Sequence, residues 1–282
     1  MNTNARSSDH ATNRRARMYR LQAVVLRRRN LGESDRILTV FSKELGKHRF
    51  VAKGVRRPGS KLAGHSEPFM IAEFFLARTR GLPILSQAEP LRAFRRLRTS
   101  EQAIAVAGLI AERVDVLTGE DEAAPSVYAL VENSLELLDS GVEPERVLLI
   151  FGLLLLAETG FRSGLQTCIE CGEPLTAVPN AFAVDRGGFI CHRCPSPGAG
   201  ARMVAVDVQK VMRMIDRGEL AQVLGVRASP GLFRQAEGLV SDYIETITGR
   251  DSTATRVIRD LRLEYDYQVE RKEPEDGDGI PG

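Results

Sequence analysis

Between residues 19 and 89 the apolar residues occur in short segments separated by turn residues, a pattern typical of β-strands. β-branched and aromatic residues are concentrated in segments 19–28, 36–42, 47–53, 69–78 and 83–89. The turn sequences NLGES, KELGK and RGLP separate neighbouring segments, and the widest gap, residues 53–68, follows the third. Five strands with the longest break at this place predict a small closed barrel of the OB type.

Beyond residue 99 the apolar positions change to a spacing of three and four residues, which predicts helices. Thr99 and Gln102 form a capping-box pattern at the start of the first helix, whose apolar positions extend to Leu117. The other predicted helices cover residues 126–138, 143–159, 206–217, 231–248 and 255–265. The longest apolar run, VLLIFGLLLLA at 147–157, is too short to span a bilayer, so we expect a buried helix and no membrane association.

All four cysteines lie in one short region, as two C-x2-C pairs separated by 19 residues. Cys168 and Cys171 form the first pair, and Cys191 and Cys194 form the second. Two residues between thiolates allow both to reach one metal ion, and two such knuckles complete a tetrahedron. The spacing therefore predicts a structural zinc site with no open coordination position, although iron fits the same ligands.

Two other uses of these cysteines are less consistent with the sequence. Disulfides require an oxidising compartment, and the chain shows no signal that would direct it to one. A thioredoxin-like redox site has a single C-x2-C motif in a βαβ context, whereas this chain has two paired motifs. We therefore expect a metal site in a cytoplasmic protein.

Together these patterns predict an α+β multidomain protein, with an N-terminal five-stranded OB-type β-barrel followed by an α-helical domain that carries the four-cysteine zinc element. We expect the barrel at residues 18–92 and the helical domain at 93–266, with the zinc-binding insertion at 165–197. Residues 1–17 are rich in arginine and lack an apolar run, so a disordered basic arm is expected. The acidic residues 267–282 are expected to form a disordered tail.

The near-neutral net charge of +2 hides a strong segregation of charge along the chain. Residues 1–98 contain 22 lysines and arginines against 7 acids, and the remainder contains 17 against 30. Ordinary solvated surfaces mix both signs, whereas a one-sided basic segment is typical of modules that bind a polyanion. The barrel is therefore predicted to bind nucleic acid.

The most concentrated cationic segment is KGVRRPGSKLAG at 53–64, in the predicted loop between strands three and four. It is not a nucleotide-binding P-loop, because Ser60 and Lys61 follow the second glycine in the wrong order. We predict instead that it contacts phosphates, together with cations on the strands and beyond them. The predicted DNA-binding residues are Arg27, Arg28, Arg36, Lys47, Arg49, Lys53, Arg56, Arg57, Lys61, Arg95 and Arg96.

Four phenylalanines in the predicted strands, Phe50, Phe69, Phe74 and Phe75, could stack on bases, although interior packing is the better interpretation for each. The sequence does not indicate an enzyme. Its four histidines are scattered, and the acids Glu120, Asp121 and Glu122 are more typical of a solvated loop than of a catalytic cluster.

The N-terminal sequence resembles the RecO family of bacterial repair proteins. The resemblance rests on GESDRIL, KELGK and KGVRRPGSKLAG followed by PF, and later on LLLLAETGFR and TRVIRDLR. It extends over about residues 18–266. It implies an OB domain, a helical domain and a zinc element, in a protein that binds single- and double-stranded DNA without strong sequence preference and anneals complementary strands.

The same resemblance implies partners. RecO proteins act with RecR to load the recombinase RecA onto strands covered by single-strand-binding protein, which places such a protein with the nucleoid in the cytoplasm. The strongly acidic helical domain of this chain departs from the family, so DNA contact is expected to be confined to the barrel. An RNA-binding or translation-linked OB protein, a nuclease, and a scaffold for acidic protein tails remain as alternatives.

Overall fold

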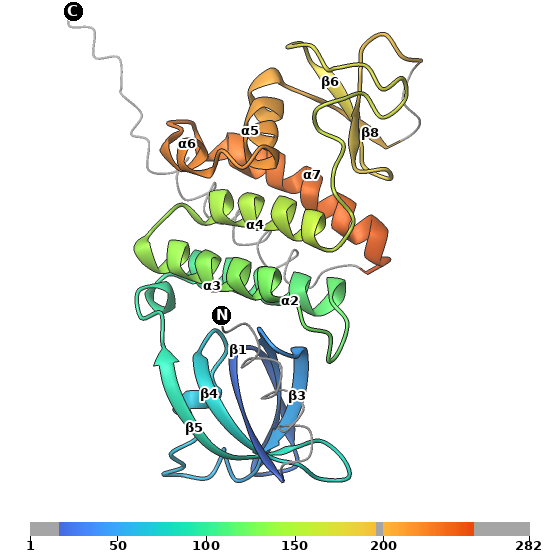
Figure 1. Ribbon diagram of the computed structural model, residues 1–282. Coiled ribbons are helices and arrows are strands. Elements are labelled where there is room, and N and C mark those ends of the chain that lie inside the picture. Colours follow the sequence, from blue (N-terminus) through green and yellow to red (C-terminus); the bar gives the residue numbers. More distant parts are fainter. Residues whose placement is uncertain (1–16, 196–199, 251–282) are drawn as a thin grey trace, which may run out of the picture.

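The computed structural model describes residues 17–195 and 200–250 (Figure 1). The expected helix at 255–265, the acidic tail at 267–282 and the basic arm, apart from Arg17, lie outside these residues. The described chain has the barrel at one end, layers of helices in the middle, and a small sheet at the other end. None of its described helices has both the length and the apolar character needed to cross a bilayer.

Five strands form a closed barrel in the order β1-β2-β3-β5-β4, which confirms the predicted OB-type domain. All neighbouring pairs are antiparallel except β3 and β5, which are parallel. The strands are β1 (Met18–Leu31), β2 (Asp35–Ser42), β3 (Gly46–Ala52), β4 (Ile71–Ala77) and β5 (Ile84–Arg92). The segment between β3 and β4 is the predicted long cationic loop, and it includes the short 3-10 helix η1 (Gly64–Ser66).

Large apolar side chains fill the barrel, because alternate residues of each strand point inward. Phe50 and Phe74 are fully buried, and their ring centroids lie 5.1 Å apart. These two rings are therefore part of the core and do not face bases, as the interior interpretation expected. Phe69 and Phe75 are only partly buried.

The first layer of the helical domain consists of α2 (Glu101–Leu117) and α3 (Pro125–Ser140), after the 3-10 helix η2 (Leu97–Thr99). The N-cap of α2 is Ser100, whose hydroxyl accepts a hydrogen bond from the Ala103 amide at 3.2 Å. The capping box predicted on Thr99 is therefore wrong by one residue. Thr99 belongs to η2, and its hydroxyl donates to the Arg96 carbonyl instead.

The apolar run 147–157 belongs to α4 (Pro144–Glu158), which is buried on nearly all sides. Helices α2 and α3 cover one side of it, and α7 (Pro230–Thr248) covers the other (Figure 1). This position explains the uniformly apolar sequence, since a helix without a solvent face needs no polar stripe. Two shorter helices, α5 (Val206–Asp216) and α6 (Leu220–Gly225), complete the domain.

A buried ion pair joins α2 to α7. The Arg113 guanidinium donates to Glu237 Oε1 and to the Ser241 hydroxyl, both at 2.6 Å. Gly152 of α4 makes room for this pair, because a Cβ there would lie 2.9 Å from Arg113 Nη1. Both hydrogen bonds use Nη2 of Arg113, and Nη1 is buried without a hydrogen-bond partner among the described residues, so the charge is balanced by Glu237 while the guanidinium is only partly satisfied.

The cysteine region forms a three-stranded sheet in the order β7-β6-β8. Its strands are β6 (Asn180–Ala183), β7 (Gly188–Ile190) and β8 (Ala201–Val204). Asn180 and Gln209 attach this sheet to α5, since the Asn180 amide donates to Gln209 Oε1 at 2.8 Å. Gln209 in turn donates to the carbonyls of Val178 and Val204.

The barrel and the helical domain share one hydrophobic core, which includes Val24, Phe41 and Ile71 of the barrel together with α2, α3 and α4. Polar contacts reinforce this junction. The Lys47 ammonium lies 2.6 Å from the Asp115 carbonyl, 2.9 Å from the Thr118 carbonyl and 3.3 Å from Asp115 Oδ1. Lys47 thus fixes β3 to the C-terminal end of α2, where the helix carbonyls favour a cation.

We expect Lys47→Ala to lower the free energy of unfolding by about 2–3 kcal/mol, because it leaves two carbonyls without their donor and leaves the half-buried Asp115 carboxylate with Arg27 as its one remaining ion-pair partner among the described residues. Denaturant unfolding measures this loss. Arg49→Ala is the matched control, because Arg49 pairs with Glu120 at 2.9 Å on the surface, with side-chain exposures of 46% and 50%. Its cost should stay below about 1 kcal/mol, and an equal cost for the two variants would contradict the role of Lys47.

Candidate nucleic-acid interface and metal centre

The cationic loop that follows β3 is wound into consecutive turns. The amides of Arg57, Ser60 and Ala63 donate to the carbonyls three residues earlier, at 3.1, 3.1 and 3.2 Å. Gly54 and Gly59 have φ angles of 64° and 78°, in the left-handed region that glycine adopts without strain. The glycines therefore close the turns and give the loop a defined shape.

Asp35 attaches this loop to the turn between β1 and β2. Its Oδ1 accepts hydrogen bonds from the Gly54 amide at 2.8 Å and from the Ser34 hydroxyl at 3.0 Å. Arg56 adds two contacts, from its amide to the Ser34 carbonyl and from its guanidinium to the Gly32 carbonyl. The Gly54 amide and then the Ser34 hydroxyl stabilise the carboxylate, so the pKa of Asp35 lies below its usual range.

Four cations of the loop, Lys53, Arg56, Arg57 and Lys61, are exposed. None of the four forms an ion pair with another residue in the described part of the chain. Asp35 lies close enough to feel the charges of Lys53 and Arg57, but its oxygen is occupied by the amide and the hydroxyl. The loop therefore presents a local excess of positive charge on a fixed backbone.

Most of the other predicted DNA contacts pair with acids. Arg27 lies 3.0 Å from Asp115, and Arg49 contacts Glu120. Arg28 and Arg36 share the carboxylate of Glu67. These pairs differ in exposure, since 64% of the Arg27 side chain is exposed against 18% for Arg36.

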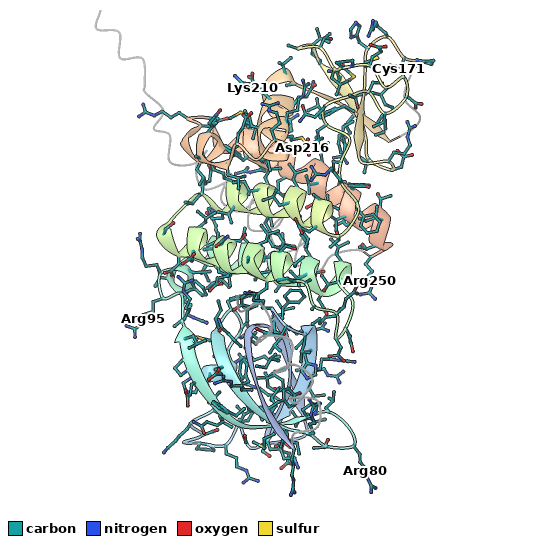
Figure 2. The ribbon with its side chains drawn as sticks, in the orientation of Figure 1. Arg80, Arg95, Cys171, Lys210, Asp216 and Arg250 are labelled. Carbon is teal, nitrogen blue, oxygen red and sulfur yellow. The ribbon has the colours of Figure 1, made fainter. Side chains whose placement is uncertain are left out.

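The remaining predicted contacts lie away from the loop. Lys47 is buried at the junction and has its donors occupied. Arg95 (labelled in Figure 2) and Arg96 are exposed in the segment between β5 and η2. Arg96 lines a groove with Glu136 and Asp139. The structure thus gathers four of the eleven predicted residues into one cationic surface without acid partners.

Sequence reasoning missed two features of the charge distribution on the barrel. Arg80, in the turn between β4 and β5, projects from the end of the barrel that is remote from the helices (Figure 2). The acids Glu120 and Asp121 do not only face solvent, because Glu120 contacts Arg49 and Asp121 Oδ1 lies 2.5 Å from His48 Nδ1. Part of the acidic charge of the helical domain is therefore used to hold the basic barrel.

The four cysteines converge at the other end of the molecule, and all four sulfur atoms lie within 4.8 Å of one another. Three sulfur–sulfur distances are 3.6, 3.7 and 3.8 Å. A tetrahedral ion with Zn–S bonds of about 2.3 Å separates its sulfurs by roughly 3.8 Å, whereas a disulfide requires about 2.05 Å. The geometry fits a four-thiolate zinc site and contradicts the disulfide alternative.

The local electrostatics agree with a cation at this place. Burial opposes ionisation of Cys168, but the amides of Cys171, Cys191 and Glu170 outweigh it and lower the pKa of its thiol to about 6. Burial and the neighbouring thiols raise the pKa of Cys194 to about 12. Four clustered thiols cannot all ionise without a positive charge between them, and a divalent cation supplies it.

Comparison with known protein families gives matches to both the barrel and the helical domain. The family model described as "Recombination protein O N terminal" matches residues 17–94, and "Recombination protein O C terminal" matches residues 98–256. The chain belongs to the RecO family. Membership in RecO supports a role in DNA repair and recombination.

Curated RecO proteins align with most of this chain. "DNA repair protein RecO" of Roseiflexus sp. (strain RS-1) is 34% identical over 248 residues, which cover 88% of this chain and 87% of the relative. The RecO protein of Bifidobacterium adolescentis is also 34% identical, over 86% of this chain and 99% of its own length. The RecO protein of Desulforamulus reducens is 31% identical over 81% of this chain.

Proposed function

We propose that this protein is a non-enzymatic mediator of homologous recombination that binds single- and double-stranded DNA without strong sequence preference. In this proposal it anneals complementary strands and, with RecR, helps to load RecA onto strands coated with single-strand-binding protein. It acts on the nucleoid in the cytoplasm. The support is the family membership together with the charge distribution of the barrel.

The observation that carries the proposal is the exposed cationic loop between β3 and β4. Lys53, Arg56, Arg57 and Lys61 are close in sequence, are held on turns, and form no ion pair among the described residues. An exposed array of cations of this kind is suited to bind phosphates. Phosphate contacts position a strand without reading its sequence. Arg27, Arg28 and Arg49 add contacts where phosphates replace their acid partners, and Arg95 and Arg96 form a separate contact region.

Lys47 and Arg36 are left out of the proposed contact surface. Their side chains are only 10% and 18% exposed, and both have partners within the fold. Phe50 and Phe74 are also left out, since both are in the barrel core. Binding that depends on phosphate contacts more than on stacking should be strongly sensitive to salt.

We propose zinc as the ion held by Cys168, Cys171, Cys191 and Cys194. Four thiolates leave no open coordination position, so the ion would stabilise the small sheet without taking part in chemistry. This sheet needs such support, since β6, β7 and β8 have only 4, 3 and 4 residues.

An annealing assay tests the proposed function. Two complementary DNA strands, each coated with single-strand-binding protein, are mixed with the purified chain without ATP. We expect duplex formation at least tenfold faster than without the chain, and no shortening of either strand in the presence of Mg²⁺. Matched RNA strands provide the comparison, because preference for RNA would favour the translation-linked alternative. Absence of annealing, or cleavage of a strand, would contradict the proposal.

Asp35 provides a second test, because it holds the loop through the Gly54 amide and is not itself one of the proposed phosphate contacts. Asp35→Ala removes the acceptor of the Gly54 amide, and we expect DNA affinity to fall about tenfold as the loop loses its shape. Asp35→Asn retains an acceptor oxygen and removes a negative charge close to Lys53 and Arg57, so affinity should stay equal or rise. Titration with a labelled strand measures both, and equal loss in the two variants would contradict an orienting role.

The lowered pKa of Asp35 also predicts how DNA binding depends on pH. Because the pKa of Asp35 is lowered in the folded chain, its contribution to the loop is fully present above the ordinary aspartate range. It is lost only as the pH falls through the lowered value. DNA binding between pH 6 and 8 should therefore be insensitive to this residue.

A further inference from the structure

A row of outward-pointing side chains crosses β1, β2 and β3. Arg27 of β1 lies opposite Thr39 of β2, and Thr39 lies opposite Arg49 of β3. Leu38 and Phe50, which neighbour Thr39 and Arg49 in their strands, point into the barrel core. Because successive side chains of a strand alternate between the two faces of a sheet, this row lies on the outer face of the barrel.

The next row of the same face adds a third cation and an apolar surface. Arg29 lies opposite Ile37, and Ile37 lies opposite Val51. Arg29 is exposed and forms no ion pair with another described residue, and the side chains of Ile37 and Val51 are partly exposed. Cations beside aliphatic side chains are suited to a single strand, whose phosphates bind positive charge and whose bases have apolar faces.

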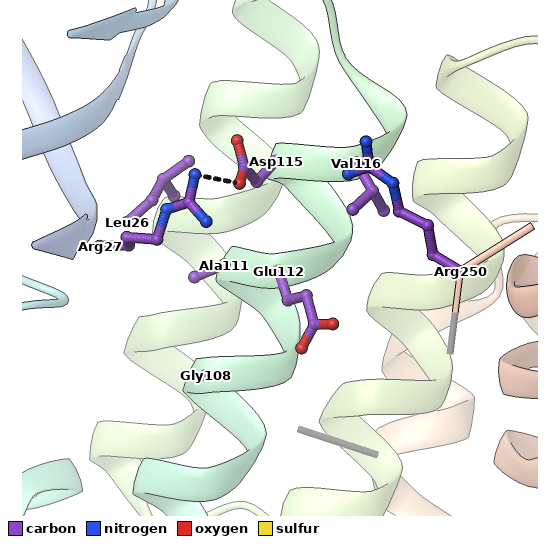
Figure 3. A pocket seen from close by; sticks show the side chains of 8 residues that line it. All are labelled: Leu26, Arg27, Gly108, Ala111, Glu112, Asp115, Val116 and Arg250. Carbon is purple, nitrogen blue, oxygen red and sulfur yellow. Dashed lines mark ion pairs between the residues drawn. The ribbon is translucent and has the colours of Figure 1, made fainter. Parts of the chain in front are cut away.

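Carboxylates of the helical domain already contact the cations of the first row. Asp115 Oδ2 lies 3.0 Å from Arg27 Nη2 (Figure 3), and Glu120 Oε2 lies 2.9 Å from Arg49 Nη2. A phosphate forms the same kind of charge-assisted hydrogen bond with a guanidinium group. Both arginines remain exposed, so a DNA strand can reach them.

The backbone holds Glu120 in this position. Because β5 pairs with β3 only near the C-terminal end of β3, the edge of β3 before that point is open to the segment that follows α2. The Asp121 amide donates to the Lys47 carbonyl at 2.8 Å, and Glu120 forms a parallel bridge with Lys47. Gly46 permits this close approach, since a Cβ there would overlap the Glu122 carbonyl oxygen.

We propose that the outer face of β1, β2 and β3 is a second surface for single-stranded DNA, on which Glu120 and Asp115 occupy phosphate positions in the free chain. The helical domain thus competes with DNA for the barrel. This inference rests on the proposed function, to which it adds Arg29 and the competing acids. Competition weakens the hold on a strand, which an annealing protein must release once the duplex has formed.

The two acids differ in how readily a phosphate displaces them. Among the described residues, the Glu120 side chain has Arg49 as its one ion-pair partner, and both side chains are exposed, so the exchange costs little. Asp115 contacts Lys47 through Oδ1 as well as Arg27 through Oδ2, and it therefore also supports the junction. Glu120 is the acid whose removal tests competition without disturbing the junction.

Titration of a labelled single strand with the full-length chain, at several salt concentrations, tests the proposal. Glu120→Gln retains the length of the side chain and removes its charge, so affinity at low salt should rise about threefold. The slope of log affinity against log salt should become steeper by about 0.7, because binding no longer exchanges one anion for another at Arg49.

A double-mutant cycle separates competition at Arg49 from a general effect of charge. In an Arg49→Ala chain, Glu120→Gln should change affinity by less than about 1.5-fold, because no cation is left for it to release. Glu219→Gln is the control for net charge, since Glu219 pairs with Arg217 between α5 and α6, and it should leave affinity unchanged. An equal gain from Glu120→Gln in both backgrounds would overturn the competition.

Arg29 tests the surface itself. Arg29→Ala removes a cation that is already available to DNA, so affinity should fall about threefold and the salt slope should decrease by about 0.7. The matched control is Arg227→Ala, because Arg227 is an exposed arginine of the helical domain that also forms no ion pair with the rest of the described chain. It should change neither quantity. Circular dichroism checks that each variant is folded.

The possible failures are distinguishable. Wild-type binding that is unchanged by Glu120→Gln, or by Arg29→Ala, would overturn this surface and leave the cationic loop as the DNA site. Absence of DNA binding by the wild-type chain and by every variant would overturn the proposed function together with this inference.

Discussion

Replacement of Arg56, Arg57 and Lys61 by alanine should lower the affinity for single-stranded DNA about 100-fold at low salt, because it removes three phosphate contacts. The three side chains are exposed and are not ion-paired with other described residues, so their loss should not unfold the barrel. Arg56 also donates to the Gly32 carbonyl, a surface contact whose loss has a small cost. Fluorescence anisotropy with a labelled strand measures the affinity.

The salt dependence separates a direct contact from an indirect effect. Each lost phosphate contact lowers the slope of log affinity against log salt by about 0.7 for single strands, so the triple variant should lose roughly 2 units. The control variant replaces Arg162, Arg202 and Arg217 of the helical domain, which removes the same charge from positions that pair with acids. It should keep the slope. An equal decrease in the two variants would show that only the net charge matters.

Cys171→Ser should abolish tight metal binding and lower the thermal midpoint of unfolding by about 10 °C, because the metal contributes directly to folding. Cys171 is exposed, so exchange of its thiol for a hydroxyl removes no core packing. We expect zinc content to fall from about one ion per chain to below a tenth, as measured by atomic emission. Limited proteolysis should then cut between residues 165 and 205 first.

His192→Ala is the control for the metal site. His192 lies next to Cys191 but is exposed, and the metal-binding group among the described residues consists of the four cysteines alone. This variant should retain its zinc and its thermal midpoint. A normal midpoint for the metal-free Cys171→Ser chain would contradict the structural role of the ion, and iron in the purified protein would correct its identity.

Elements with a regular apolar period could be predicted from the sequence. The five barrel strands and the helices α2, α3, α4, α5 and α7 occur within three residues of their predicted positions. Strands β6 and β8 and helix α6 were not predicted, because each has only four to six residues, which are too few to show a repeating pattern of apolar positions. The shift of the α2 N-cap from Thr99 to Ser100 has a similar reason, since two adjacent hydroxyl residues offer equivalent local signals.

The candidate sites were predictable to different degrees. The spacing of the cysteines predicted their convergence, because four ligands around one ion impose a local geometry that the chain must satisfy. The cations of the barrel could be identified only as a group. Their separation into exposed, acid-paired and buried members depends on residues far along the chain, such as Glu120, which lies 71 positions from its partner Arg49.

By itself the sequence determined the closed barrel, the helical domain, the metal ligands and the family of this protein, since each follows from periodicity, spacing or local motif. The tertiary structure alone decided that Lys47 supports the junction while the loop cations remain exposed, and that Asp35 gives their loop its shape. The physical reason is that the sign of a charge is encoded locally, whereas its partner and its access to solvent are set by how distant segments pack.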